Sequence, residues 1–89
     1  MYTPSFTGQF KQDRKRARKR GWDIEHLGRV MVTLIDGNTL DPIYRAHTLG
    51  GQYKAHWECH VETDFLLIWH YAPNNEIVFV RTGTHADLF

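Results

Sequence analysis

The sequence contains four side chains that could transfer protons near neutral pH. They are His47, His60, Asp64 and His85. Imidazole titrates close to neutral pH, so these side chains suit general acid–base catalysis. A single histidine is more often a surface or structural residue, so only the convergence of these four groups in space would make a catalytic site.

Metal catalysis and nucleophilic catalysis fit the sequence less well. His56 and His60 would share a face on a helix, but alternating residues around them predict a strand, which separates the two imidazoles by roughly 13 Å. With a single cysteine and no HExxH motif, we expect no metal and no cofactor. Ser5 lies near the N-terminus and Cys59 falls on the predicted core face, where thiols are usually inert.

The positive charge is concentrated at the N-terminus. Residues 1–20 carry a formal charge of +6, whereas residues 21–89 carry −5. A cationic stripe of this kind suits a polyanion such as RNA, although many charge runs are only solvated helix faces. The residues expected to bind RNA or the ribosome are Lys11, Arg14, Lys15, Arg18 and Lys19.

Two helices are predicted in the N-terminal half. Thr7 can cap a first helix that runs to about Arg20, and Asp23 can cap a second helix that ends at Gly37. The following stretch, GNTLDPIYRAHTLGG, has no sustained periodicity. It is expected to be a long connection with one short helical turn.

The second half predicts an antiparallel meander. From Ala55 to Glu62 the residues alternate, which predicts a strand with Trp57 and Cys59 facing the core and polar side chains facing the other way. FLLIWHY and EIVFVRT are two further predicted strands, and the terminal HADLF is expected to form a helical turn. The predicted fold class is α+β, with two N-terminal helices packed on a small, mainly antiparallel β-sheet and a short C-terminal helical turn.

Length and composition set the remaining expectations. A chain of 89 residues with 42% hydrophobic residues is expected to form one domain, residues 1–89. One cysteine excludes an internal disulfide, and the sequence offers neither a signal peptide nor a long apolar span. We therefore expect a cytoplasmic protein without a membrane partner. Pro4 would confine any N-terminal strand to an edge or to a short length.

Several motifs in the second half resemble a known family. The run YRAHTLGGQYKAHWECHVETDFLLIW and the terminal RTGTHADLF contain H-x-L-x-G, HV-x-x-D and R-x-G-[ST]-H-x-x-L-F. Together with the opening SFTGQFKQD, they strongly resemble the YafQ branch of the RelE/ParE superfamily of bacterial toxin–antitoxin toxins. The resemblance covers nearly the whole chain and implies the RelE-like fold.

The resemblance implies an mRNA interferase, an endoribonuclease that cleaves mRNA on the translating ribosome and is silenced by a cognate antitoxin. The toxin alone is expected to be monomeric. The family's functional positions fall on His47, His60, Asp64, His85 and Phe89, with Lys54 and Arg81 near the phosphate. Where the best-known member has tryptophan after the aspartate, this chain has Phe65, which keeps a stacking surface but removes an N–H donor.

RNA cleavage without a metal uses the substrate's own 2′-hydroxyl as nucleophile and needs a base, an acid and a cation at the phosphate. We expect His85 to be the general acid, and either His47 or Asp64 to be the base. His60 is expected to position the substrate or to share in proton transfer. Arg81 would anchor the phosphate, and Phe65 and Phe89 would stack on bases.

Two alternatives remain open. A ParE-like protein of the same superfamily would inhibit DNA gyrase without catalysis, but the acid–base set speaks against this function. A basic RNA-binding module would need only the cationic stripe and aromatic side chains.

Overall fold

The two long helices begin at the capping residues that the sequence indicates. The computed structural model describes residues 1–89, with helix α1 at Gly8–Lys19 and helix α2 at Ile24–Ile35. The side chain of Thr7 accepts a hydrogen bond from the backbone N–H of Phe10, and the side chain of Asp23 accepts one from His26. Each cap satisfies a backbone donor that a helix start leaves free. Both predicted helix starts are confirmed.

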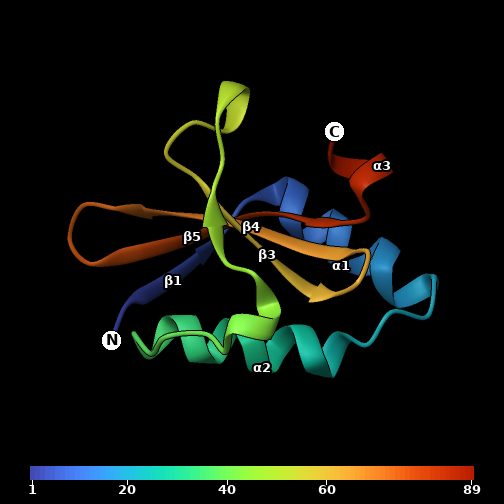
Figure 1. The fold of residues 1–89 in the computed structure, drawn as a ribbon, viewed down its shortest axis with the longest axis horizontal. Helices are drawn as coiled ribbons and strands as arrows, with labels where there is room; N and C mark the ends of the chain where they lie inside the picture. The colour runs from blue at the N-terminus through green and yellow to red at the C-terminus, as the bar shows by residue number, and fades with distance from the viewer.

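A five-stranded mixed sheet forms the centre of the fold, in the order β1-β5-β4-β3-β2 (Figure 1). The strands are β1 (Thr3–Phe6), β2 (His47–Thr48), β3 (Trp57–Glu62), β4 (Phe65–Ala72) and β5 (Glu76–Gly83). β3, β4 and β5 form the predicted antiparallel meander. β1 pairs in parallel with β5 at the edge of the sheet. Since no strand lies on its other side, the missing N–H of Pro4 costs the sheet no hydrogen bond.

The long connection after α2 has more structure than its sequence predicts. It contains two 3₁₀ turns, η1 (Pro42–Tyr44) and η2 (Gly51–Tyr53), instead of one. Between them β2 pairs antiparallel with β3. A strand of two residues is too short to show periodicity, which is why sequence reasoning missed it.

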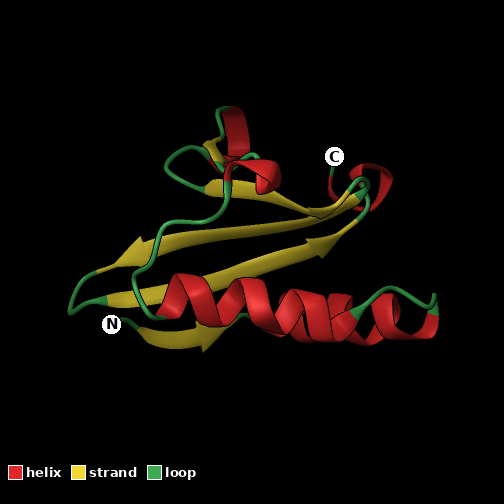
Figure 2. Cartoon of the chain, turned by 60° about the horizontal axis from the view of Figure 1, so that its bottom comes forward, coloured by secondary structure: helices red, strands yellow, loops and turns green.

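The two faces of the sheet differ in what covers them. α1 and α2 cover one face, and the main core lies there, with Phe10, Leu27, Leu67, Trp69 and Phe79 among its buried members. The other face carries a smaller cluster of Leu66, Ile68 and Leu88, the last from the short helix α3 (His85–Leu88), with Tyr53 of η2 packed against it. η1 instead lies beside α2, where the Tyr44 hydroxyl is 2.8 Å from Nε2 of His26. Figure 2 shows the three helices and both 3₁₀ turns in red around the strands. The predicted α+β class and terminal turn are confirmed. No helix in the structure is long and apolar enough to cross a bilayer.

Candidate active site

Strand register brings distant residues into one row across the sheet. His47 of β2 pairs with Glu58 of β3, Glu58 pairs with Ile68 of β4, and Ile68 pairs with Arg81 of β5. Residues directly opposite each other share a sheet face. This row therefore places His47, Glu58 and Arg81 on the face that the long helices leave open.

A second row carries the remaining candidates. His60 pairs with Leu66, and Leu66 pairs with Gly83, the last residue of β5 before the turn into α3. A Cβ atom on Gly83 would lie 2.8 Å from Asp87 Oδ2, so a side chain there would disturb the turn. α3 then carries His85 back over this end of the sheet. The sheet therefore brings His60 and His85 together although 24 residues separate them in sequence.

His85 is held by Asp64. Asp64 Oδ1 accepts hydrogen bonds from the His85 backbone N–H at 3.0 Å and from its Nδ1 at 3.1 Å. The hydrogen bond from the backbone and then that from the imidazole lower the pKa of Asp64 from its ordinary value of 3.8. With Nδ1 engaged, Nε2 is the nitrogen of His85 that can meet a substrate.

His47 is engaged at both ring nitrogens. Nδ1 lies 2.7 Å from the carbonyl oxygen of Arg45, and Nε2 lies 3.2 Å from Oε1 of Glu58. The Glu58 side chain is only 4% exposed, and its second oxygen, Oε2, is buried without a hydrogen-bond partner. This buried carboxylate beside an imidazole is a candidate functional group that sequence reasoning missed. The sequence does hold a signal for it, because Glu58 lies two residues before His60 and so on the same face of the predicted strand.

His60 lies between the other two histidines. Its ring centroid is 6.3 Å from that of His47 and 6.0 Å from that of His85. Nδ1 of His60 lies 3.3 Å from the carbonyl oxygen of Thr63. A carbonyl oxygen only accepts, so Nδ1 carries a proton, and in the neutral imidazole Nε2 then presents the lone pair. The three imidazoles thus form a continuous line, with His60 in its centre.

Arg81 is tied to helix α1. Its Nε lies 2.7 Å and its Nη2 3.3 Å from the carboxylate of Asp13, whose side chain is fully buried. The hydrogen bond to Asp13 raises the pKa of Arg81 further. Arg81 is therefore a fixed cation. Lys54, the other expected phosphate contact, is exposed at the end of η2.

The two aromatic candidates differ in exposure. Phe89 is 59% exposed, and its ring lies 5.9 Å from that of His85 and 5.7 Å from that of Tyr53. Phe65 is fully buried, which corrects the expectation that it stacks on a base. Alternate residues of a strand face the same way, so Phe65 shares a face with Leu67 and Trp69 and points toward the helices. The indole of Trp22 covers it, with ring centroids 5.2 Å apart.

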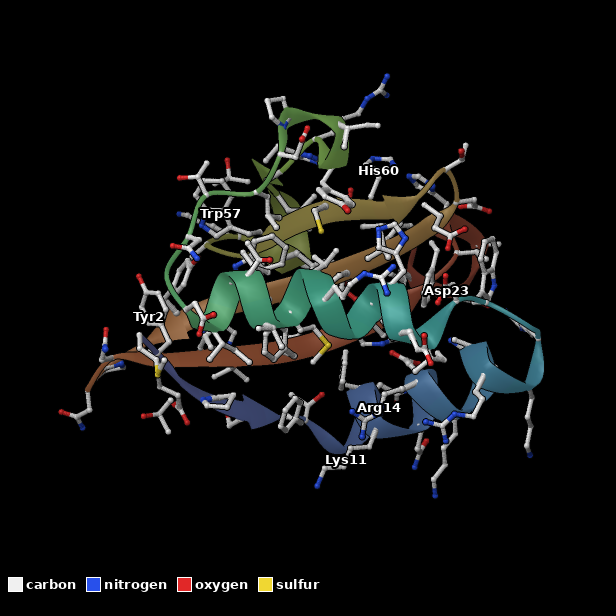
Figure 3. The ribbon with its side chains drawn as sticks, turned by 90° about the horizontal axis from the view of Figure 1, so that it is seen from below. Tyr2, Lys11, Arg14, Asp23, Trp57 and His60 are labelled. Atoms are coloured by element: carbon white, nitrogen blue, oxygen red, sulfur yellow. The ribbon has the colours of Figure 1, made fainter.

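The cations of α1 fall into two groups. Arg20 Nη1 lies 2.7 Å from Asp87 Oδ2, and Arg16 binds both Asp13 and Asp87, so these two arginines connect α1 to the terminal turn. The other exposed cations, which form no ion pair, are Lys11, Lys15, Arg18 and Lys19. Lys11 points away from the sheet in Figure 3. Arg14 is half-buried, with its guanidinium 5.6 Å from the centroid of Phe10.

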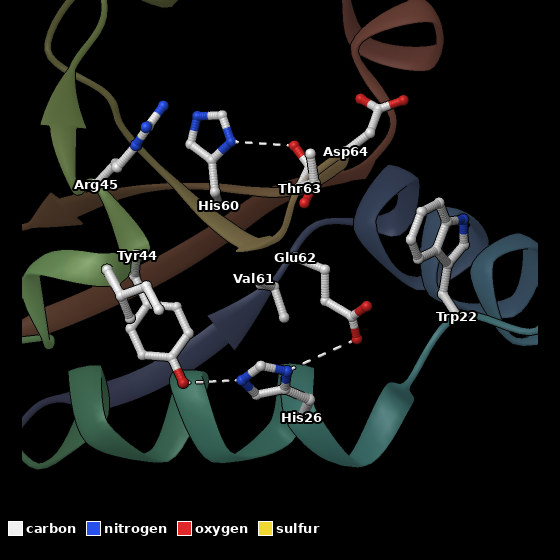
Figure 4. A pocket seen from close by; sticks show the side chains of 10 residues that line it. Trp22, His26, Tyr44, Arg45, His60, Val61, Glu62, Thr63 and Asp64 are labelled. Atoms are coloured by element: carbon white, nitrogen blue, oxygen red, sulfur yellow. Dashed lines mark hydrogen bonds and ion pairs between the residues drawn. The ribbon is translucent and has the colours of Figure 1, made fainter.

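A pocket of about 950 Å³ adjoins the line of histidines (Figure 4). Its lining includes His60 and Asp64 together with Trp22, His26, Tyr44, Arg45 and Glu62. Glu62 was expected to share a face with His60, but the strand register shifts between these two residues. This bulge turns Glu62 toward α2, where its Oε1 lies 3.7 Å from Nδ1 of His26.

One group of side chains has the spacing of metal ligands. It consists of Asp23, His26 and Glu62, whose ligand atoms lie within 4.8 Å of one another. One carboxylate oxygen of Asp23 is already in use, because Oδ1 accepts the capping hydrogen bond from the backbone N–H of His26. Cys59 is buried in the core, and burial raises its pKa to about 12, so its thiol is inert at neutral pH.

Comparisons with known proteins identify the family of this chain. The family model for the bacterial toxin YafQ of type II toxin–antitoxin systems matches residues 2–89. The mRNA interferase toxin YafQ of Escherichia coli K12 is 40% identical over 86 residues, which is 94% of this chain and 91% of that protein.

Two solved structures have the same fold. YafQ in the E. coli DinJ–YafQ toxin–antitoxin complex superposes with a TM-score of 0.90 at 37% identity, covering 99% of this chain and 97% of that one. A metal-bound toxin from Helicobacter pylori superposes with a TM-score of 0.92 at 34% identity, covering 100% of both chains. This chain belongs to the YafQ family of toxins from bacterial type II toxin–antitoxin systems.

Proposed function

We propose that residues 1–89 act as one RelE-like toxin domain with mRNA interferase activity, cleaving mRNA on the translating ribosome by metal-independent acid–base catalysis. The observation that carries this proposal is the line of three imidazoles from His47 through His60 to His85, with ring centroids 6.3 and 6.0 Å apart. Membership of the YafQ family and the mRNA interferase of E. coli support it.

His60 is the general base of the proposed reaction. The two bases expected from the sequence, His47 and Asp64, are both engaged with other side chains. In the neutral form that a base requires, His60 has an unused Nε2 lone pair, because its Nδ1–H faces the carbonyl oxygen of Thr63. Nε2 would accept the proton of the 2′-hydroxyl while the 2′-oxygen forms a bond to phosphorus.

His85 is the general acid. Asp64 accepts from Nδ1–H and fixes the ring, which leaves Nε2 to carry the proton that is transferred. As the bond between phosphorus and the 5′-oxygen breaks, Nε2–H gives its proton to that oxygen. The products are a 2′,3′-cyclic phosphate and a free 5′-hydroxyl, so no water or metal-bound hydroxide enters this step.

The remaining groups stabilise charge and hold the RNA. Arg81, fixed by Asp13, would face the negative phosphorane. His47, held by Glu58 and the Arg45 carbonyl at its two nitrogens, would add a polar contact on the same sheet face. Lys54 would contact the phosphate backbone, and the exposed ring of Phe89 would stack on a base.

Mapping of RNA ends on programmed ribosomes tests this function. The wild-type protein should create new 5′-hydroxyl ends at defined codons, and the His85→Gln variant should lower the single-turnover rate by about 10²–10⁴-fold. His70→Gln is the matched control, since His70 contacts His56 and not the three imidazoles. Absence of new ends with the wild type would favour a ParE-like gyrase inhibitor or a basic RNA-binding module.

The partners follow from the same proposal. A cognate antitoxin would neutralise the toxin, as the structure of the E. coli YafQ with DinJ suggests for this chain. Translation takes place in the cytoplasm, which is where the proposed activity would act. We further propose that the free toxin is a monomer.

A further inference from the structure

We propose that the pocket beside His60 and Asp64 binds one nucleobase of the mRNA, next to the phosphate that is cleaved. Trp22 would be its stacking platform, and Glu62 with His26 would read the edge of the base. This proposal rests on the proposed ribonuclease function and adds a specificity site to it. The pocket volume of about 950 Å³ lies in the range of small-ligand pockets.

The position of the pocket fits a nucleotide adjacent to the reacting one. His60 and Asp64 belong both to its wall and to the catalytic line. Figure 4 shows Arg45 and His60 at the same wall. An RNA strand whose phosphate lies between His60 and His85 would therefore pass along this wall. The exposed guanidinium of Arg45 is available there for a neighbouring phosphate.

Trp22 supplies the aromatic surface that Phe65 does not. Phe65 is fully buried and lies under the indole, with an angle of 18° between the ring planes. One face of Trp22 is thus supported by the core, and the side chain lines the pocket although Phe65 does not. A rigid, half-buried indole backed by another ring is a suitable platform for a base, since every base can stack on it.

His26 and Glu62 supply polar groups at the pocket wall. The phenol of Tyr44 lies 2.8 Å from Nε2 of His26, and Glu62 Oε1 lies 3.7 Å from Nδ1. The side chain of Glu62 remains 35% exposed, so its carboxylate can still accept hydrogen bonds. A carboxylate accepts from the amino group of a base. The site should therefore prefer a base that carries an exocyclic amino group over uracil.

Nuclear magnetic resonance can test the site without catalysis. The His85→Gln protein, labelled with ¹⁵N, would be titrated with adenosine, cytidine, guanosine and uridine monophosphates. We expect the indole N–H signal of Trp22 to shift, and to shift least with uridine monophosphate. The indole signals of Trp57 and Trp69 are internal controls, because both lie outside the pocket.

Two results of the titration would overturn the proposal. One is an unchanged Trp22 signal at millimolar nucleotide. The other is a response to Zn²⁺ or Mg²⁺ alone with none to nucleotides, which would assign the pocket to a cation held by Asp23, His26 and Glu62. Neither result depends on cleavage, so the failure of this site is distinguishable from failure of the ribonuclease function.

Cleavage on the ribosome provides the second test. Trp22→Ala should raise KM on the order of 10- to 100-fold, with a smaller effect on kcat, and Trp22→Phe should restore most of the loss. Glu62→Gln should keep the packing of Trp22 and reduce the discrimination against uracil at one codon position. A loss of ribosome affinity that is the same for every codon would instead assign the pocket to ribosomal RNA and overturn the proposal.

Trp57→Phe is the control for the loss of an indole, and it should leave KM and codon preference unchanged. If Trp22→Ala lowers stability without changing KM, and Glu62→Gln leaves codon preference unchanged, Trp22 serves only to cover Phe65 and the proposal is wrong.

Discussion

The buried carboxylate of Asp13 binds the guanidinium of Arg81, with 2.7 Å between Oδ2 and Nε. The two residues lie 68 positions apart in the sequence, one on α1 and the other on β5. Asp13 also accepts from Arg16 and from the backbone N–H of Thr82. Helix α1, whose outer face is cationic, thus uses its one carboxylate to hold the proposed phosphate anchor in place.

Removing this carboxylate should destabilise the protein. Asp13→Ala leaves the Thr82 N–H and the Arg81 guanidinium without their shared acceptor, and breaking a buried ion pair costs about 3–5 kcal/mol. Because Arg81 keeps 20% exposure, water can recover part of that loss. Urea unfolding would measure the change. The control is Glu25→Gln on the exposed start of α2, which should stay within about 0.5 kcal/mol of the wild type. Equal stability of Asp13→Ala and wild type would contradict a stabilising role for the Asp13–Arg81 ion pair.

The Asp64–His85 contact should make stability depend on pH. The pKa of Asp64 is lowered in the folded protein, so the ionised carboxylate stabilises the fold above its unfolded value of 3.8, and this contribution disappears as the pH falls through the lower folded value. Asp64→Asn should therefore be less stable than wild type at pH 7, and the two should converge in strong acid. Urea unfolding at a series of pH values tests this. A difference that persists unchanged in strong acid would contradict the charge-based explanation.

Gly83 should be required for the position of His85. In Gly83→Ala the new Cβ would lie 2.8 Å from Asp87 Oδ2, and the backbone φ of +150° is one that side chains rarely adopt. The Thr84–Asp87 capping box would then shift, and α3 with it. We expect cleavage on the ribosome to fall while the far-ultraviolet circular dichroism spectrum is retained. Gly28→Ala is the control, because nothing lies within 4 Å of a Cβ there. Normal cleavage by Gly83→Ala would be evidence that Gly83 is not needed to position His85.

The exposed cations of α1 should supply non-specific affinity for ribosomal RNA. Replacing Lys11, Lys15, Arg18 and Lys19 by glutamine should weaken ribosome binding and flatten its dependence on salt, because fewer counterions are released from the phosphates. Arg16 and Arg20 are left in place, since they bind Asp87. Ribosome affinity measured at several salt concentrations gives the slope, and an unchanged slope would rule out this contribution.

The sequence predicts the elements well because their signals are local. Thr7 and Asp23 cap the two helices, and the alternation from Trp57 onward marks a strand whose partners follow directly. Phe65 shows where the motif alone fails, since its position after Asp64 predicts a stacking residue while its parity with Leu67 puts it in the core.

Long-range features carry no such local signal. The bulge after His60 turns Glu62 toward His26, but polar and apolar residues still alternate through Glu62 in the sequence, so the pattern does not mark it. The pairing of Asp13 with Arg81 depends on how α1 crosses the edge of the sheet. It could be suspected only from an acidic residue that occupies the same helix stripe as Phe10 and Ala17.

The most direct test of acid–base cleavage through the 2′-hydroxyl is a single-turnover assay with a modified mRNA. A ribosome-bound message would carry one 2′-deoxynucleotide immediately 5′ of the phosphate that is cut, and the matched unmodified message would serve as control. Because that 2′-oxygen is the proposed nucleophile and His60 its base, the modified message should remain intact while the control is cut. Cleavage of both messages at similar rates would contradict this mechanism, because it would require an external nucleophile.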